Sequence, residues 1–323
     1  MTKAERKDLS LKGLELFQAV ARNGSLLEAA EETGLSTSTI SHHLRALEAS
    51  LGIELFNHKR RPMVLTPKGQ AFLRNIDNAL HSIRKAKAEA AAGDITDASY
   101  LRLGTIEDLD SDIIPDLAVH LSSSMPRCDF LYITDFSHTV LEMLHNRQLD
   151  LGITSTPADR PHELVDRPFL RDPFVMVAPN STEHHTSDIL AGKTDLPFLR
   201  FSKNLMVARQ IESQLNRLGL SLPNRFECGN NQTLMAMVAS GAGWTITTPL
   251  MFSRAKRFQD QLKLSKFPGK SFSRTLSIVT TPDCAHSIVD LVDYKLRELV
   301  SRHAISPLHR ATSWLSDSFK LIS

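Results

Sequence analysis

The sequence is poor in cysteine, and it lacks both a long apolar run and a large excess of either charge. Its three cysteines, Cys128, Cys228 and Cys284, lie far apart, and an odd number without paired spacing argues against a disulfide framework and a zinc site. No segment approaches the ~20 consecutive apolar residues that a membrane-spanning helix requires, and the polar N-terminus lacks the apolar stretch of a secretion signal. We therefore expect a cytoplasmic protein that does not bind membranes.

The sequence also lacks the short motifs that mark many enzymes. It contains no glycine-rich phosphate loop, no G-x-S-x-G elbow, and no H-x-x-x-H or C-x-x-C pair. We therefore expect no catalytic residue, no metal ion and no cofactor.

The net charge of +2 over 323 residues conceals an uneven distribution. Residues 1–92 contain 14 Lys and Arg against 10 Asp and Glu, whereas the remainder contains 24 against 26. A cationic front weakly favours nucleic-acid binding, because phosphate neutralisation supplies much of the affinity for DNA, although solubility alone also explains so small a surplus. The length itself predicts two or three domains.

Three short helices are predicted before residue 51. Apolar residues spaced three or four apart indicate a helix that ends at Asn23-Gly24, and Ser25 with Glu28 forms a capping box for a second helix. Gly34 suits a tight turn, and Ser36 is a natural N-cap for a third helix that runs to about residue 50. The pattern predicts two helices that cross at a short turn.

A small hairpin and a long helix follow. Residues 54–58 and 63–65 flank a basic tip, which indicates a wing. Thr66-Pro67 then begins a helix to residue 92 whose apolar residues form one narrow stripe. The stripe consists of Phe72, Ile76, Leu80, Ile83 and Ala90. So narrow a stripe is poorly suited to burial within a monomer and favours pairing with a second copy.

Beyond a hinge at 93–98, strands and helices alternate as in an open α/β sheet. The expected strands are 101–104, 130–134, 149–154, 174–178, 198–201, 225–227, 244–247 and 276–280, and the expected helices are 113–122, 140–145, 207–218, 233–240 and 287–303. These elements predict a domain over 99–303, with lobe I at about 99–170 and 271–303 and lobe II at about 171–270. The segment 304–323 remains an unassigned C-terminal extension.

The third helix carries the strongest functional pattern. Its apolar face consists of Ile40, Leu44, Leu47 and Leu51, and small polar residues lie largely on the other face. Such residues near a helix start can approach base edges in a major groove, although most polar helix faces are merely solvated. The wing and the long helix that follow favour the DNA-binding interpretation, with residues 1–65 as the DNA-binding domain.

Over residues 11–73 the sequence resembles the LysR-type transcriptional regulators. The resemblance lies in FQAVARNGSLLEAAEETGLS, TISHHLRALEASLGIELF and LTPKGQAFL. It extends more weakly over the remainder, at RQLDL (147–151) and at Gly241-Ala242-Gly243 followed by Pro249. It implies an N-terminal all-α winged helix-turn-helix with a long linker helix, and then a two-lobed, periplasmic-binding-protein-like α/β effector domain.

The expected DNA contacts lie on the third helix and the wing. They are Ser36, Thr37, Ser38, Thr39, Ser41, His42, Arg45, His58, Lys59, Arg60 and Arg61. The cationic run at the wing tip is placed for phosphates, whereas exposed adjacent histidines such as His42 are more often plain surface. The family usually has glutamine and proline at Thr37 and Ser38 and arginine at His58, so an operator sequence does not carry over from the resemblance.

The resemblance also implies an effector site between the two lobes. It falls on Thr105, Glu107, Asp108, Ser137, His138, Ser202, Lys203, Asn230 and Thr247, together with their neighbours Ile106, Asn231 and Thr248. A helix N-cap at Ser137 and the charge of Lys203 favour an anionic ligand, whereas Glu107 and Asp108 favour a cationic or amine-bearing one. Each residue alone is also consistent with an ordinary surface or capping role.

Two hypotheses follow. In the first, the protein is a DNA-binding transcription regulator whose partners are double-stranded DNA, a small-molecule effector and a second copy of itself, as a homodimer that the resemblance extends to a homotetramer. In the second, it is a cytosolic binding protein or enzyme that uses its N-terminal helices only for oligomerisation.

Overall fold

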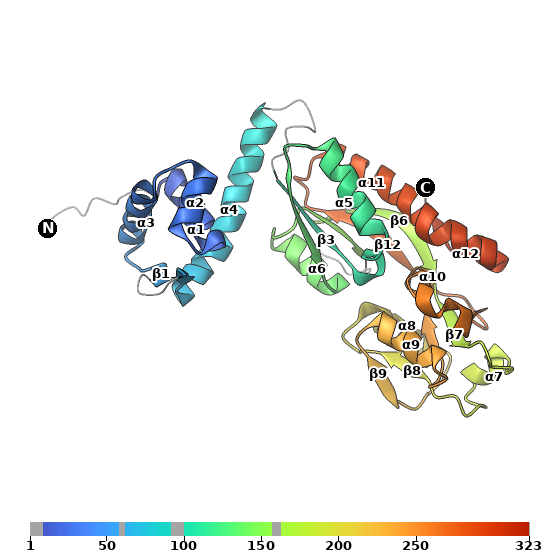
Figure 1. Cartoon of the computed structure of the whole chain (residues 1–323). Coiled ribbons are helices and arrows are strands. Elements are labelled where there is room, and N and C mark those ends of the chain that lie inside the picture. Colours follow the sequence, from blue (N-terminus) through green and yellow to red (C-terminus); the bar gives the residue numbers. More distant parts are fainter. Residues whose placement is uncertain (1–8, 58–61, 92–99, 157–162, 323) are drawn as a thin grey trace. The chain divides into compact units, whose positions relative to one another are not determined.

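The computed structural model describes residues 9–57, 62–91, 100–156 and 163–322. The chain forms two compact units, Met1–Ser99 and Tyr100–Ser323 (Figure 1). The expected hinge at 93–98 lies outside the described residues. In the described part of the chain, no helix combines the length and the apolar character needed to span a bilayer.

The first unit begins with three capped helices, α1 (Leu11–Asn23), α2 (Leu26–Thr33) and α3 (Thr37–Leu51). The hydroxyls of Ser10, Ser25 and Ser36 each accept a backbone N–H from the first turn, as N-caps do. Each helix ends at a glycine with φ between 65° and 68°, a left-handed conformation that costs glycine little. The serine half of the expected capping box at Ser25 is therefore present.

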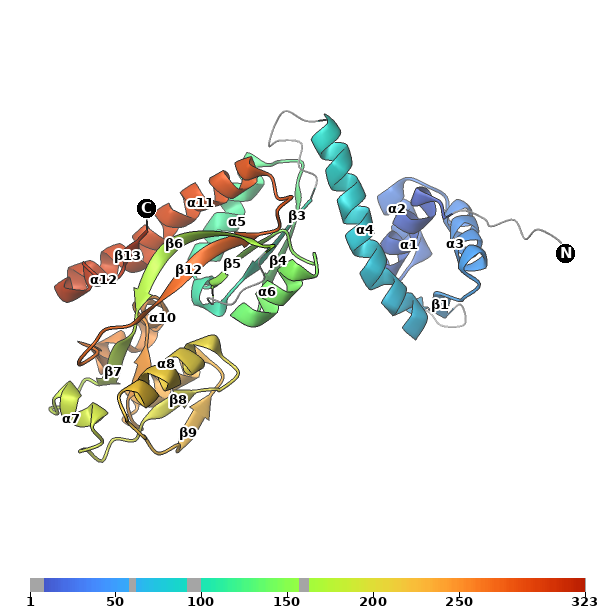
Figure 2. The same ribbon diagram turned by 180° about the vertical axis from the view of Figure 1, so that it is seen from behind.

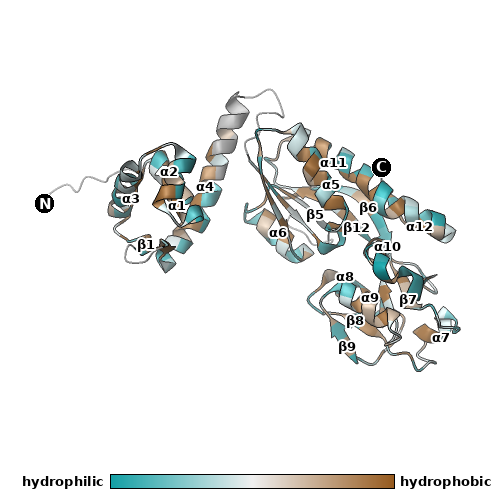
Figure 3. Cartoon of the chain, in the orientation of Figure 1, coloured by the Kyte–Doolittle hydropathy of each residue, from teal (hydrophilic) through white to brown (hydrophobic). Residues whose placement is uncertain are grey.

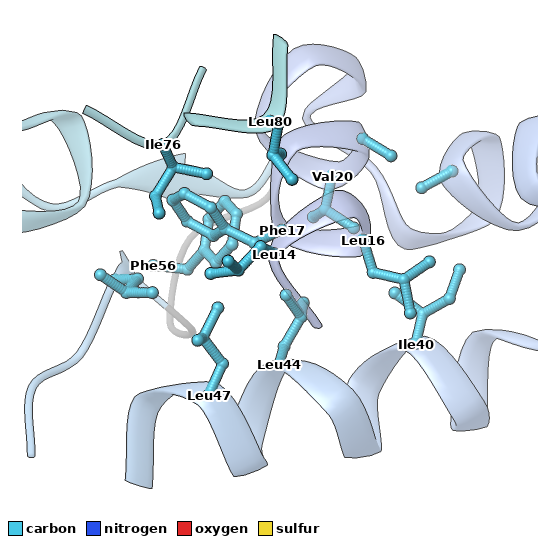
Figure 4. Packing of buried hydrophobic residues seen from close by; sticks show 13 residues of the cluster. Leu14, Leu16, Phe17, Val20, Ile40, Leu44, Leu47, Phe56, Ile76 and Leu80 are labelled. Atoms are coloured by element: carbon cyan, nitrogen blue, oxygen red, sulfur yellow. The ribbon is translucent and has the colours of Figure 1, made fainter. Parts of the chain in front are cut away.

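The helices enclose one apolar core around Phe17, whose side chain is fully buried. The ring of Phe17 lies 5.3 Å from that of Phe56 and 5.5 Å from that of Phe72, measured between centroids. Ile40, Leu44 and Leu47 project from α3 towards α1 (Figure 4). The apolar spacing in the sequence therefore fixes which face of α3 is buried and leaves its polar face outside.

The wing consists of β1 (Phe56–Asn57) and β2 (Val64–Leu65), paired antiparallel with Phe56 opposite Leu65. The Glu48 carboxylate accepts hydrogen bonds from the backbone N–H groups of Leu55 and Phe56 at 2.7 and 3.2 Å, which holds β1 against α3. At the other end, the N–H of Met63 donates to the carbonyl of Gly24 at 2.8 Å. Both ends of the wing are therefore anchored to the helices.

Helix α4 (Pro67–Ala91) begins at Thr66, whose hydroxyl accepts the N–H of Gly69 at 3.0 Å. We expected the apolar stripe of this helix to pack against a second copy of the chain. The first part of the stripe is instead buried within the same chain, which corrects that expectation. Ile76 and Leu80 are 9% and 1% exposed in the core of the same chain, and Phe72 packs against that core. Ile83, further along, is 37% exposed. The stripe is divided because the three-helix head covers one end of the long helix.

The larger lobe of the second unit is a six-stranded sheet in the order β13-β6-β12-β5-β3-β4. Its strands are β3 (Tyr100–Thr105), β4 (Asp129–Thr134), β5 (Leu151–Ser155), β6 (Val165–Pro173), β12 (Ser273–Thr280) and β13 (Lys320–Leu321). β3 pairs parallel with β4 and β5, and β12 pairs antiparallel with β5 and β6. The helices of this lobe are α5 (Ile113–Ser124), α6 (Ser137–His145) and α11 (His286–Val300), and the apolar residues of α5 and α11 are brown in Figure 3.

The smaller lobe contains a three-stranded sheet in the order β10-β7-β11 and a parallel pair, β8-β9. Its strands are β7 (Val175–Pro179), β8 (Leu199–Phe201), β9 (Phe226–Cys228), β10 (Thr245–Thr247) and β11 (Leu262–Lys266), and its helices are α7 (Thr186–Leu190), α8 (Met206–Arg217), α9 (Asn231–Ala239) and α10 (Pro249–Ser253). β6 leads into β7, and β11 leads back into β12, so the chain crosses twice between the lobes (Figure 2). Strands β6, β11 and β13 were missing from the expected elements.

The C-terminal segment, unassigned from sequence, belongs to the larger lobe. After α11 the helix continues through a π-helical stretch, Ser301–Ile305, into α12 (Ser306–Ala311). β13 then pairs with β6, and the side chains of Leu315 and Phe319 are fully buried. The segment therefore closes the sheet edge at β6, which would otherwise present unpaired backbone groups.

Candidate functional site

The exposed face of α3 is the first candidate surface. Thr37, Ser38, His42 and Arg45 are exposed, whereas Ile40 and Leu44 on the opposite side are buried. Of the other expected DNA contacts on this helix, Ser36 is exposed and Thr39 and Ser41 are half-buried. The structure therefore gathers these residues on one polar side of the helix.

Some residues on this face already make hydrogen bonds within the protein. The Ser36 hydroxyl lies 2.8 Å from the Ser38 hydroxyl and 2.7 Å from the Thr39 hydroxyl, and it also accepts the Thr39 N–H. The main role of Ser36 is therefore to cap α3, because its loss would leave a backbone N–H at the helix start without a hydrogen bond. The four wing-tip residues of the prediction, 58–61, lie outside the described residues.

A cleft of about 340 Å³ lies between the two lobes of the second unit. Its lining comes from the loop after β3, the end of β4 with the start of α6, and the ends of β5 and β8 with the starts of α8 and α9. The carboxyl ends of β3, β4 and β5 therefore face it, as expected for ligand sites in open α/β sheets. Its size lies in the usual range for small-molecule sites.

Arg274 forms a buried polar cluster in the cleft wall. Its Nε donates to Asp172 at 2.9 Å, and its Nη2 donates to Asp108 at 2.5 Å and to the Thr248 hydroxyl at 3.1 Å. Burial raises the pKa of Asp172, and the guanidinium opposes that rise. Burial lowers the pKa of Arg274, but the two carboxylates outweigh it, so the net change is upward. The arginine therefore stays charged.

A second set of polar contacts joins the lobes around Glu107. Its carboxylate accepts the Asn230 side-chain N–H at 3.0 Å and lies 3.1 Å from Nη1 of Arg254. Nearby, Nζ of Lys256 donates to Asp112 at 2.8 Å. These contacts connect the loop before α5 with the smaller lobe, so any change in lobe spacing must break or rearrange them.

The expected effector residues fall into three groups. Ile106, Glu107, Asp108, Ser137 and Asn231 line the cleft. Thr105, Thr247 and Thr248 are fully buried, and Asn230 contacts Glu107. His138 is exposed, and Ser202 and the backbone of Lys203 donate to Glu227, so these three are not among the lining residues.

One local prediction was wrong. The N-cap of α6 is Phe136, and Ser137 is the first helical residue. Phe136 makes no side-chain cap hydrogen bond, and the Asp135 carboxylate accepts the N–H of Phe136 at 2.7 Å.

Several lining residues were missed from sequence. Arg274 and Ser155 contribute polar groups, and Phe136, Phe201, Leu205, Met206 and Met251 contribute apolar ones. A charged residue beside an apolar strand, as Arg274 is beside 276–280, was the available signal for a buried ion pair. The others come from element ends that become neighbours only after the lobes fold.

In the described residues, no group of three or more His, Cys, Asp or Glu side chains is arranged to hold a metal ion. Comparisons with known proteins assign a family to each of the two units. Residues 11–70 match the model "Bacterial regulatory helix-turn-helix protein, lysR family", and residues 96–289 match "LysR substrate binding domain". The chain belongs to the LysR family.

Curated relatives of this LysR-family chain are transcription regulators. It is 26% identical over 273 residues to the HTH-type transcriptional regulator YofA of Bacillus velezensis, covering 84% of the chain and 91% of that protein. It is 25% identical over 235 residues to the regulator GltR of Bacillus subtilis, covering 73% and 78%. This LysR-family chain is therefore a DNA-binding transcription regulator with a substrate-binding domain, and these relatives are regulators rather than enzymes.

Solved structures show the same fold. Full-length OxyR of Pseudomonas aeruginosa matches with a TM-score of 0.67 at 20% identity, covering 92% of the LysR-family chain and 98% of that protein. Full-length CbnR, solved in complex with its target DNA, matches with a TM-score of 0.55 at 18% identity, covering 90% and 99%. A helix-turn-helix head followed by a two-lobed α/β domain is thus common to all three.

Proposed function

We propose that this regulator reads duplex DNA with the exposed face of α3 and that a small-molecule effector in the interlobe cleft controls its action. The observation that carries the proposal is the polar row Thr37, Ser38, His42 and Arg45 on a helix whose other side is fixed in the core. A major groove admits one α-helix, and side chains near its start reach base edges.

The residues of this face suit distinct contacts. Arg45 can donate two hydrogen bonds to guanine, and the hydroxyls of Thr37 and Ser38 can contact several bases. Lys59, Arg60 and Arg61 at the wing tip would contact phosphates, which positions the helix without reading sequence. CbnR, which shares the fold, has been solved with its target DNA.

Two copies are expected to act together. A pair of heads matches the two halves of a pseudo-palindromic site, and the part of α4 beyond the head, with Ile83 37% exposed, supplies a surface for pairing. We propose a homodimer as the basic unit, a homotetramer as its assembly, and the cytoplasm as its location.

Control by an effector would act through the contacts around Glu107. A ligand that favours one lobe spacing shifts the population of that spacing by its difference in affinity for the two states. The Glu107–Arg254 and Asp112–Lys256 contacts join the lobes at the cleft and would change with that spacing.

The proposed function is tested by DNA binding of the full chain. Genomic fragments retained by the protein are selected first, and the affinity for one selected fragment is then titrated with salt. We expect affinity to fall steeply as salt rises, because counterions are released from phosphates. Arg45→Ala should weaken binding to the selected fragment by about 1–3 kcal/mol, whereas Arg310→Ala, at an exposed position of α12, should not. A chain that retains no fragment, or binds equally well after Arg45→Ala, contradicts the proposal.

A further inference from the structure

Carboxylates dominate the charge of the interlobe cleft. Among the described residues, its charged lining consists of Glu107, Asp108 and Asp135 against Arg274 alone. The guanidinium of Arg274 is already matched by Asp108 and by the fully buried Asp172. Arg254 lies against Glu107. Counting these neighbours, carboxylates still outnumber guanidinium groups in and around the cleft.

Two buried polar atoms in the lining have no hydrogen-bond partner among the described residues: the Ser155 hydroxyl and Oδ1 of Asn231. Both residues are 2% exposed. The amide nitrogen of Asn231 donates to the Met251 carbonyl at 2.9 Å, which leaves its oxygen as an acceptor. Buried polar groups are nearly always paired, so an unpaired acceptor in a cleft wall indicates that a ligand or water donates to it.

The alternative, an anionic ligand, has weaker support in the cleft. The Lys203 side chain, which favoured an anion on sequence grounds, is exposed and is not among the lining residues. The start of α6 carries backbone N–H groups that suit an anion, but Asp135 already lies there and accepts the N–H of Phe136. Its negative charge opposes a second anion at the same helix end.

The remaining wall is apolar. Phe201, Leu205, Met206 and Val207 come from the smaller lobe, and Phe136, which is 44% exposed, comes from the start of α6. An apolar ligand portion would bury this surface, with a gain of roughly 25 cal/mol per Å². The cleft thus combines carboxylates and hydrogen-bond acceptors with an apolar wall.

We infer that the effector is an organic amine: a protonated amino group that donates to Asn231 Oδ1 and the acidic loop at Glu107, joined to a hydrophobic chain or ring. The inference rests on the proposed function, since it names the ligand class of the same cleft. A protonated amine supplies three donors and no acceptor, which matches the groups that lack a partner here.

The test uses the full chain and matched probe pairs. One pair is 3-phenylpropylamine and 3-phenylpropanoate, and the other is hexylamine and hexanoate. Thermal unfolding and calorimetric titration should show that the amines bind and raise the melting temperature by mass action, while the carboxylates do not. Binding of the carboxylates in preference to the amines, or of none of the four, overturns the inference.

Variants locate the amine. Glu107→Gln keeps the side-chain shape but removes one charge, and should weaken amine binding about tenfold, as loss of one charge-assisted contact does. Ser155→Ala, which removes a hydroxyl without a partner, should also weaken it. The matched control is Glu142→Gln on the exposed side of α6, which makes the same charge change outside the lining. Equal weakening by Glu142→Gln would mean that the amines respond to overall charge, and would overturn the inference.

DNA binding is measured on the same samples. A chain that binds its selected fragment but not the amines leaves the proposed function standing and removes the amine. A chain that binds the amines but no DNA supports the amine as ligand and contradicts the proposed function.

Discussion

Asp172 and Arg274 face each other as register partners on β6 and β12, the two strands that lead between the lobes. Nε of Arg274 lies 2.9 Å from Oδ2 of Asp172, and the Asp172 side chain is completely buried. Asp172 also accepts the N–H of Leu250, at the start of α10. One ion pair therefore joins both crossing strands to the smaller lobe, beside the cleft.

Replacing Arg274 by methionine should strongly destabilise the second unit. The variant leaves the buried carboxylates of Asp108 and Asp172 without their cationic partner. Breaking a buried ion pair in this way costs about 3–5 kcal/mol. Urea unfolding of the full chain measures the change. Arg167→Met is the matched control, because Arg167 pairs with Asp290 at the surface, where a pair contributes about 0–1 kcal/mol. Equal losses in the two variants would contradict the structural role of Arg274.

Gly69→Ala should destabilise the DNA-binding head. A Cβ at this position would lie 2.0 Å from the Leu55 carbonyl oxygen, so the start of α4 or the wing must shift. Overpacking of this kind costs about 1–3 kcal/mol. Thermal unfolding followed by circular dichroism should show an earlier transition for the first unit, and DNA affinity should fall with it. Gln70→Ala, at the exposed next position, should leave both unchanged.

Phe319→Ala should show that the C-terminal segment is part of the larger lobe. Phe319 is fully buried, and removing a buried phenyl group costs about 3–5 kcal/mol. Trp314→Ala removes a larger side chain that is 36% exposed, and should cost clearly less. Chemical denaturation of both variants gives the comparison. A segment that merely trailed from α12 would show little loss in either variant, because neither side chain would be buried.

Cys128 should react slowly with alkylating reagents. Burial raises the pKa of its thiol from 9.0 to about 11, with Asp129 adding to the effect. Because the thiolate is the nucleophile, the reactive fraction at pH 8 falls from about one in ten to about one in a thousand. Iodoacetamide labelling followed by mass spectrometry should show a rate that keeps rising with pH beyond pH 9. Labelling of the urea-unfolded chain, where the shift is lost, should level off earlier, and identical profiles would contradict the shift.

Much of the DNA-binding head could be predicted from local sequence. Capping serines, terminal glycines and the spacing of Ile40, Leu44 and Leu47 each act within a few residues, so they set the helices and the face of α3 that stays exposed. The alternation of strands and helices after residue 100 likewise indicated an open α/β domain. Strands β6, β11 and β13 were missed because their burial depends on partners far along the chain: β6, for example, pairs with β12, about a hundred residues away.

The sequence by itself determined the local elements, the polar face of α3 and the two-domain plan, because backbone capping and apolar periodicity are short-range effects. Tertiary structure alone decided that Arg274 meets Asp108 and Asp172. It also decided that Asn231 and Ser155 of the cleft lining each hold a buried polar atom without a hydrogen-bond partner among the described residues. Finally, it decided that Phe72, Ile76 and Leu80 of the α4 stripe pack within their own head. Those outcomes depend on which surfaces become neighbours once the chain crosses twice between lobes. The spacing of residues within one helix or strand carries no information about these long-range contacts.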